Sequence, residues 1–400
     1  MTIRRRRLLG TAAALPLAPA AIGGLAAPAI AQRAPIRIGM ITTLSGPGAA
    51  LGNDIRDGFA LVVKNAGGRL GGYPVEVVVA DDGLRPENGR AIAERMVRRE
   101  RIQVLTGIVF SNVMLAVAPV VLGPATYISA NAGPSQLAGE GCNPNYFNVA
   151  WQNDNLHEAV GQYVTRQGVK RAFILAPNYP AGRDALTGFK RFYKGEVVSE
   201  TYTRLDQLDY AAELAAIRAA NPEAVFIFLP GGLGINFIKQ YAAAGLRGRI
   251  PLYGPGFSFD QDVLPAVGDD ALGCFNSSQW ALDLPFPANR QFVDTFEAEY
   301  KRLPSLYASQ GYDAALLIGS ALAATRGEVS DRAAFNAALK RAAFQSVRGS
   351  FRFGNNNHPI QTIYMREVVK DAQGRMVNRT IGTAFENHQD AYAAQCRLPA

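Results

Sequence analysis

The chain has 400 residues, of which 48% are hydrophobic and 18% are charged, and its formal net charge is +8. Four arginines stand together at positions 4–7, so half of the excess positive charge lies at the start of the chain. The remainder is only mildly basic and has no long basic run, which argues against a nucleic-acid partner. About 370 residues follow the N-terminal segment, a length that favours two lobes over one core.

The first 31 residues have the pattern of an export signal. Arg4–Arg7 precede an Ala- and Leu-rich stretch that ends in Ala29-Ile30-Ala31, a small-x-small cleavage site. The pair Arg5-Arg6 fits a twin-arginine signal. Prolines and glycines interrupt the stretch, which argues against a membrane anchor. We therefore expect cleavage near Ala31 and a periplasmic product.

The cysteines and histidines give no sign of a metal site. Of the three cysteines, Cys142 and Cys396 lie in polar segments, whereas Cys274 lies in an apolar run typical of a buried strand. In an oxidising compartment this favours a disulfide between Cys142 and Cys396, although connectivity cannot be deduced from sequence. The three histidines are scattered, so we expect neither a metal nor a cofactor.

From Pro35 onward, predicted strands and helices alternate. The strands are expected at 35–43, 73–80, 104–108, 126–130, 171–176, 197–202, 224–229 and 251–253. The helices between them are expected at 53–66, with Asn53 as cap, and at 87–100, 112–121, 184–193, 210–220 and 235–244. Three further helices follow at 288–301, 307–325 and 331–343, and then strands at 350–353, 361–369 and 376–381.

This alternation predicts an α/β protein with doubly wound parallel sheets, and its two series predict two Rossmann-like lobes. The late helices suggest that the chain returns to the first lobe. The expected N-terminal lobe is 32–151 with 282–349, and the expected C-terminal lobe is 152–281 with 350–400. Three segments near 151–154, 279–283 and 349–355 would cross between them.

Glycine-rich turns follow several predicted strands, at 44–52, 107–112, 129–135, 229–232 and 253–256. Ligands bind at the carboxyl ends of strands in open α/β sheets, where free N–H groups favour anions. The chain has no phosphate-binding loop and no nucleophile elbow. Asp81-Asp82 follow a strand and form a carboxylate pair of the kind that does acid–base work, but such residues more often cap a helix or are solvated.

Several segments, taken in order, resemble extracytoplasmic solute-binding proteins of the branched-chain amino-acid class. They are Leu44–Pro47 with Gly52, Gly58–Gly68, Asp81-Asp82, Gly107–Ser111, Pro180–Asp184 and Gly311–Ala314. The resemblance implies a type I periplasmic-binding fold that captures a small solute between its lobes, without catalysis. It also implies delivery to the permease and ATPase of an ABC importer, and we expect a monomer.

The resemblance also implies ligand contacts. Ser111 and the turn Asn131-Ala132-Gly133 match the family's carboxylate-binding positions. Leu51 and Ala181 stand where aromatics are common, and Tyr179 is close by. Gly256 stands where amino-acid binders place the acid that pairs with the ligand ammonium. Phe110 and Phe259 are further wall candidates. The expected ligand-binding residues are Leu51, Ser111, Asn131, Ala132, Gly133, Tyr179, Ala181, Pro230, Gly256, Phe257 and Trp280.

Because a buried ammonium without a carboxylate partner is costly, Gly256 argues against an α-amino acid. Segments 106–113 and 129–137 also resemble members that serve aromatic-acid uptake, so we expect a carboxylate-bearing aromatic solute. The alternatives are an amino-acid binder in which Asp260 or Asp262 pairs with the ammonium, and a ligand-sensing regulator on the same fold. A hydrolase built on Ser111 or Asp81-Asp82 is the least favoured.

Overall fold

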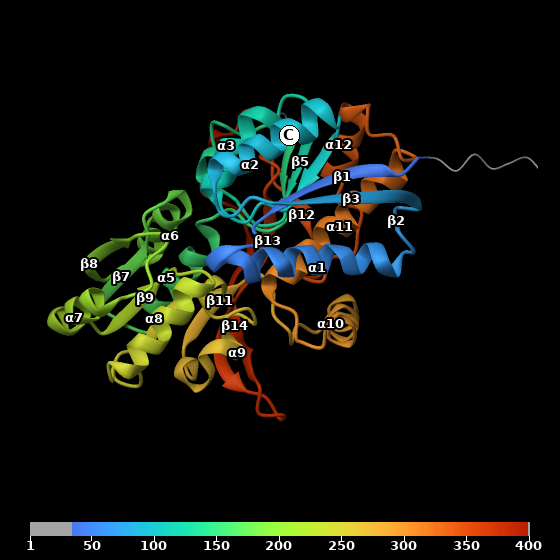
Figure 1. Ribbon diagram of the computed structural model, residues 1–400. Helices are drawn as coiled ribbons and strands as arrows, with labels where there is room; N and C mark the ends of the chain where they lie inside the picture. The colour runs from blue at the N-terminus through green and yellow to red at the C-terminus, as the bar shows by residue number, and fades with distance from the viewer. Residues whose placement is uncertain (1–33, 399–400) are drawn as a thin grey trace, which may run out of the picture. The chain divides into compact units, whose positions relative to one another are not determined.

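The computed structural model describes residues 34–398, which build two β-sheets with helices packed on them (Figure 1). The export signal predicted for residues 1–31 lies outside the described residues. From Pro35 onward the contacts of the chain form a single unit. No helix in this described part is both long and apolar enough to cross a membrane.

The first sheet has the strand order β2-β3-β1-β4-β5-β6. Its strands are parallel except β2, which runs antiparallel to β3. The strands are β1 (Ile36–Thr42), β2 (Arg69–Leu70), β3 (Tyr73–Asp81), β4 (Val104–Thr106), β5 (Thr126–Ser129) and β6 (Tyr146–Asn148). The helices between them are α1 (Ala49–Asn65), α2 (Pro86–Glu94), α3 (Ser111–Val121) and α4 (Ser135–Ala138).

Three late helices follow the second series of strands: α10 (Pro287–Tyr300), α11 (Leu306–Ala324) and α12 (Arg332–Lys340). Helix α11 packs along α1 and contacts β5 (Figure 1). Glycines allow this close approach, because a Cβ at Gly311 would lie 2.0 Å from the Ile55 carbonyl oxygen and one at Gly58 would lie 2.0 Å from that of Ala308. The chain therefore returns to the first sheet, while the lobe limits given above remain predictions.

The second sheet has the order β12-β13-β11-β10-β9-β7-β8, with β14 paired to β13. Strands β7 to β11 are parallel, and β12, β13 and β14 add an antiparallel edge. The strands are β7 (Arg171–Pro177), β8 (Glu196–Thr203), β9 (Ala224–Ile227), β10 (Leu252–Pro255), β11 (Phe275–Ser278), β12 (Arg352–Phe353), β13 (Pro359–Lys370) and β14 (Met376–His388). The helices are α5 (Asn155–Arg166), α6 (Pro180–Phe192), α7 (Ala211–Ala220), α8 (Gly232–Ala243) and α9 (Leu264–Val267).

The predicted elements are present but differ at their ends, and β2, β6, α4, α5 and α9 were not predicted. Helix α1 begins at Ala49 rather than after Asn53, because a short 3-10 turn at Gly46–Gly48 leads directly into it. The helix predicted over 87–100 is α-helical only to Glu94 and then forms one π-helical turn. Strand β14 runs to His388 rather than to 381.

A disulfide joins Cys142 and Cys396, whose Cα atoms are 5.6 Å apart. This confirms the pairing that the sequence favoured. The bond ties the loop between α4 and β6 to the segment that follows β14. Cys274 is free and buried directly before β11, and burial raises the pKa of its thiol to about 12.

Candidate functional site

A cavity lies at the carboxyl ends of strands from both sheets, the edge that doubly wound sheets use for ligands. The turns after β4, β5, β7, β9 and β10 reach it, and the space between its lining residues is about 310 Å³, part of which is open to solvent. The lining residues are Leu51, Val109, Phe110, Ser111, Asn131, Ala132, Trp151, Asn153, Tyr179, Ala181, Phe228, Pro230, Phe257 and Tyr307.

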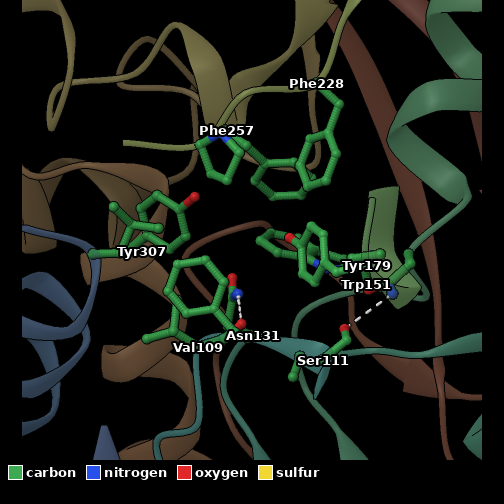
Figure 2. Close-up of a pocket in the computed structure, with 14 residues that line it drawn as sticks. Val109, Ser111, Asn131, Trp151, Tyr179, Phe228, Phe257 and Tyr307 are labelled. Atoms are coloured by element: carbon green, nitrogen blue, oxygen red, sulfur yellow. Dashed lines mark hydrogen bonds between the residues drawn. The ribbon is translucent and has the colours of Figure 1, made fainter. Parts of the chain in front are cut away.

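Six aromatic side chains line the cavity, and most of them are labelled in Figure 2. The Trp151 and Phe257 rings meet edge to face with centroids 4.4 Å apart, and Phe228 lies 5.6 Å from Phe257. Tyr179 stacks near Phe228 at 6.2 Å, and Tyr307 lies 6.3 Å from Phe257. Burial raises the pKa of both tyrosines well above the usual value, so their hydroxyls stay protonated. The wall suits a flat apolar group.

The polar groups lie on the opposite side of the cavity in Figure 2, where Ser111 and Asn131 face the aromatic wall. Ser111 is the first residue of α3, whose first-turn N–H groups have no partner within the helix. The amide of Asn153 donates to Ser111 Oγ at 3.1 Å, and Asn131 Nδ2 donates to the Val109 carbonyl at 2.6 Å. A helix N-terminus combined with a hydroxyl suits an anionic acceptor.

Eight of the eleven predicted ligand-binding residues line this cavity. Because the turns after successive parallel strands meet at one edge, residues far apart in the sequence converge there. The eight are Leu51, Ser111, Asn131, Ala132, Tyr179, Ala181, Pro230 and Phe257. Their contact with a ligand remains a prediction.

Trp280 and Gly133 do not line the cavity. Trp280 is a fully buried core residue, whose indole Nε1 donates to Asn289 Oδ1 at 2.6 Å and whose ring packs on Phe292. The backbone N–H of Gly133 donates to Asn153 Oδ1 at 3.1 Å and so is not available to a ligand. Gly133 therefore supports a lining residue instead of lining the cavity itself.

Gly256 also lies behind the cavity wall. A Cβ at this position would lie 2.7 Å from Arg366 Nη2, so its open side faces a buried guanidinium. That guanidinium pairs with Asp260 at 2.8 Å, and Asp260 also accepts the Leu306 N–H at 3.0 Å. Asp260 is thus already neutralised and does not line the cavity. Phe259, a predicted wall residue, is likewise buried outside it.

Asp262 is the second acid considered for an ammonium group. Both of its carboxylate oxygens are buried without a hydrogen-bond partner, and the residue does not line the cavity. Burial, with the nearby Asp260, raises the pKa of its carboxyl well above the usual value. A carboxyl that lies outside the cavity is not placed to pair with a ligand ammonium.

The Asp81-Asp82 pair shapes the turns after β1 and β3. Asp82 is fully buried and accepts from Thr43 Oγ1 at 2.7 Å and from the Leu84 N–H at 2.8 Å. Asp81 accepts the Leu44 and Gly83 N–H groups, each at 2.8 Å. The pair therefore fixes turns rather than lying in the cavity. Asp82 is buried, whereas solvent exposure was one of the roles expected for this pair from the sequence.

Sequence reasoning missed four prominent lining residues, Trp151, Asn153, Phe228 and Tyr307. Trp151 and Asn153 lie in a segment read only as a crossing between lobes. Phe228 follows β9 in an apolar run that was predicted as buried strand, and Tyr307 is the second residue of the late helix α11. The one available signal was Phe228, because it directly precedes the glycine-rich turn at 229–232. Among residues 34–398, no group of three or more His, Cys, Asp or Glu is placed to hold a metal.

A family model described as periplasmic binding protein matches residues 35–373. A Leu/Ile/Val-binding protein homolog 6 of Brucella melitensis is 30% identical over 365 residues, covering 89% of this chain and 93% of that relative.

Solved structures agree with this match. An ABC-transporter solute-binding protein of R. palustris in complex with benzoate is 33% identical with a TM-score of 0.86, covering 91% of this chain and 100% of that one. Another, from Rhodopseudomonas palustris BisB5 in complex with 3,4-dihydroxy benzoic acid, is 29% identical with a TM-score of 0.82, covering 89% and 98%. A leucine-binding protein of Thermotoga maritima is 17% identical with a TM-score of 0.76, covering 86% and 97%, and shares the fold.

These matches confirm the predicted fold class and the resemblance seen in the sequence. Related proteins of this kind bind small molecules and work with a permease and an ATPase, and the family name implies a periplasmic location. The chain belongs to the periplasmic binding protein family, as a solute-binding protein of an ABC transporter in the Leu/Ile/Val-binding class.

Proposed function

We propose that the protein binds a small aromatic carboxylic acid in this cavity and presents it to an ABC importer. The observation that carries the proposal is the composition of the lining. Six of the fourteen residues are aromatic, Ser111 offers a hydroxyl at a helix N-terminus, and none of the fourteen is an Asp or Glu. Such a cavity pairs an apolar wall with an anion-binding end.

The absence of an Asp or Glu side chain from the cavity lining favours an aromatic acid over an amino acid as the ligand. An α-amino acid brings an ammonium group, which in a buried site costs several kcal/mol unless a carboxylate pairs with it. Gly256 occupies the expected acidic position, and Asp260 is committed to Arg366 at 2.8 Å. An aromatic acid without an ammonium group needs no carboxylate partner in the cavity.

Related proteins support both candidates. Neighbours from R. palustris were solved in complex with benzoate, 3,4-dihydroxy benzoic acid and 4-hydroxybenzoate. The Brucella relatives carry Leu/Ile/Val-binding names. The second candidate is therefore a branched-chain amino acid, and the lining of the cavity favours the first.

Calorimetry separates the two candidates. We expect benzoate or 4-hydroxybenzoate to bind and to raise the melting temperature, because a ligand that binds only the folded state stabilises it. Leucine and phenylalanine should give no comparable heat. Phenylalanine set against its amine-free analogue, 3-phenylpropanoate, isolates the ammonium group at constant ring size. Tight binding of a free amino acid without binding of the amine-free acids would contradict the proposal.

We further propose export through the twin-arginine route, cleavage near Ala31 and a monomeric product with the two lobes given above. N-terminal sequencing of the protein from the periplasm tests the cleavage site. A chain that keeps residues 1–31 and fractionates with membranes would contradict it.

A further inference from the structure

The side-chain amide of Asn153 has a fixed orientation beside the cavity. Its Oδ1 accepts the Gly133 N–H at 3.1 Å, and the Asn153 N–H donates to the Gly133 carbonyl at 2.8 Å. Its Nδ2 donates to Ser111 Oγ at 3.1 Å and to Asp184 Oδ2 at 2.9 Å. A flipped amide would place two donors together at Gly133 and two acceptors together at Asp184.

This orientation leaves the Ser111 hydroxyl proton to the ligand. Since Asn153 Nδ2 occupies a lone pair of Ser111 Oγ, and none of the described residues accepts from that hydroxyl, its proton is free to point into the cavity. The Ser111 hydroxyl therefore acts as a donor to an acceptor such as a carboxylate.

Asp184 does not line the cavity, but its carboxylate connects residues on the polar side of the cavity to a helix of the second sheet. It lies on α6, which packs on β7, and it is only 7% exposed. Ser135, at the start of α4 in the first series, donates to it twice, from N–H at 3.1 Å and from Oγ at 2.8 Å. Asn153 donates a third hydrogen bond to the same carboxylate. The Asp184 side chain therefore holds the segments that contain Ser135 and Asn153 against α6.

We propose that Asp184 is a positioning residue that couples the ligand contact at Ser111, through Asn153, to the contact between the first-sheet loops and α6. A bound carboxylate orders Ser111, Ser111 holds Asn153, and Asn153 with Ser135 holds α6. Breaking this bridge lets the ligand escape faster without slowing its entry. The inference rests on the proposed function only in placing the ligand carboxylate at Ser111.

The test measures benzoate association and dissociation rates separately. Asp184→Ala removes the acceptor of three hydrogen bonds, so we expect dissociation to become about tenfold faster or more, with association changed less than about threefold. Asp184→Asn keeps an oxygen for the two N–H donors and can donate to Ser135 Oγ, so it should stay within about threefold of wild type. Asp206→Ala, at an exposed carboxylate, is the matched control and should change neither rate.

A double-mutant cycle with Ser135→Ala tests whether the bridge acts as a unit. The effects of Ser135→Ala and Asp184→Ala should be clearly less than additive, because each removes the same contact. Additive effects, or an Asp184→Ala variant that releases benzoate at the wild-type rate, would overturn the proposal. So would equal changes in association and dissociation.

A ligand-free measurement keeps this inference distinct from the proposed function. We expect the Asp184→Ala variant to have a larger radius of gyration by small-angle X-ray scattering than wild type, while Asp206→Ala matches wild type. Unfolding curves establish that each variant is folded. If wild type fails to bind benzoate, the proposed function fails. The scattering comparison alone then tests whether Asp184 connects the first-sheet loops to α6. Equal radii for Asp184→Ala and wild type would then refute it.

Discussion

Ser111 combines two properties that a carboxylate-binding residue needs. It begins α3, so the unpaired N–H groups and the positive end of the helix dipole lie beside it. Its hydroxyl already accepts from Asn153, which leaves the proton for a ligand. It is 2% exposed, so water competes little for that proton.

Replacing Ser111 with Ala should therefore weaken benzoate binding by about ten- to a hundredfold, the equivalent of one charge-assisted hydrogen bond. Calorimetry measures the change. Ser199→Ala, at a half-buried serine of β8 whose hydroxyl bonds Thr201, serves as the matched control and should bind like wild type. An unchanged affinity in Ser111→Ala would place the ligand carboxylate elsewhere.

His157 lies behind the aromatic wall, with its ring 5.0 Å from Phe228 and 5.9 Å from Phe257. Its Nδ1 is buried without a hydrogen-bond partner, and burial lowers its pKa to about 3. In the unfolded chain this histidine has its usual pKa of 6.5. Between pH 6.5 and pH 3 it is therefore neutral in the folded protein and protonated in the unfolded chain. Its contribution to stability is complete above pH 6.5 and is lost as the pH falls toward 3.

The His157→Leu variant should consequently lose less stability on acidification than wild type. Between pH 6.5 and 3 the difference should change by about 1.4 kcal/mol per pH unit. Urea unfolding of both proteins at pH 7.5, 5.5 and 4.5 measures it. Burial raises the pKa of Asp54 to about 6 and that of Asp154 to about 7, so these two groups change the stability in the opposite direction on acidification. Both are present in wild type and in the variant, so their contribution cancels when the two proteins are compared. Parallel curves would show that His157 is not the group involved.

At the scale of elements, helix α11 shows how a late segment completes the first half of the molecule. It packs on α1 so closely that backbone meets backbone at Gly58 and Gly311. Tyr307, near the start of the same helix, lines the cavity. The packing of α11 on α1 thus also places part of the aromatic wall.

Introducing one methyl group at this contact should be costly. In the Gly311→Ala variant the new Cβ would lie 2.0 Å from the Ile55 carbonyl oxygen, so the two helices must move apart. Overpacking of this kind typically costs about 1–3 kcal/mol. Gly123→Ala is the control, because a Cβ there meets nothing within 4 Å. Urea unfolding should show the loss only for Gly311→Ala, and equal stabilities would argue that the helices are less tightly packed.

At the scale of the whole molecule, the order of elements could be predicted because each strand and helix has its own apolar periodicity. The edge at which the cavity lies followed from the turns at strand ends. Ser111, Asn131 and Tyr179 were predicted from the resemblance to solute-binding proteins. Trp151 and Tyr307 were missed because tertiary packing, and no local pattern, brings a crossing segment and a late helix to that edge. Trp280 was misplaced for the same reason, since an aromatic near a predicted crossing can face either core or cavity.

The disulfide is a second whole-molecule constraint, since Cys142 and Cys396 are 254 residues apart in the chain. Closing so long a loop restricts the unfolded chain, and losing a native disulfide typically costs about 2–5 kcal/mol. The Cys142→Ser/Cys396→Ser double variant should unfold at correspondingly lower urea concentration. Neither cysteine lines the cavity, so benzoate affinity should be unchanged. Reductant should move the wild-type curve onto that of the variant and leave the variant where it is, because Cys274 has no partner to lose. A wild-type curve that does not respond to reductant would mean that the bond does not constrain the protein in solution.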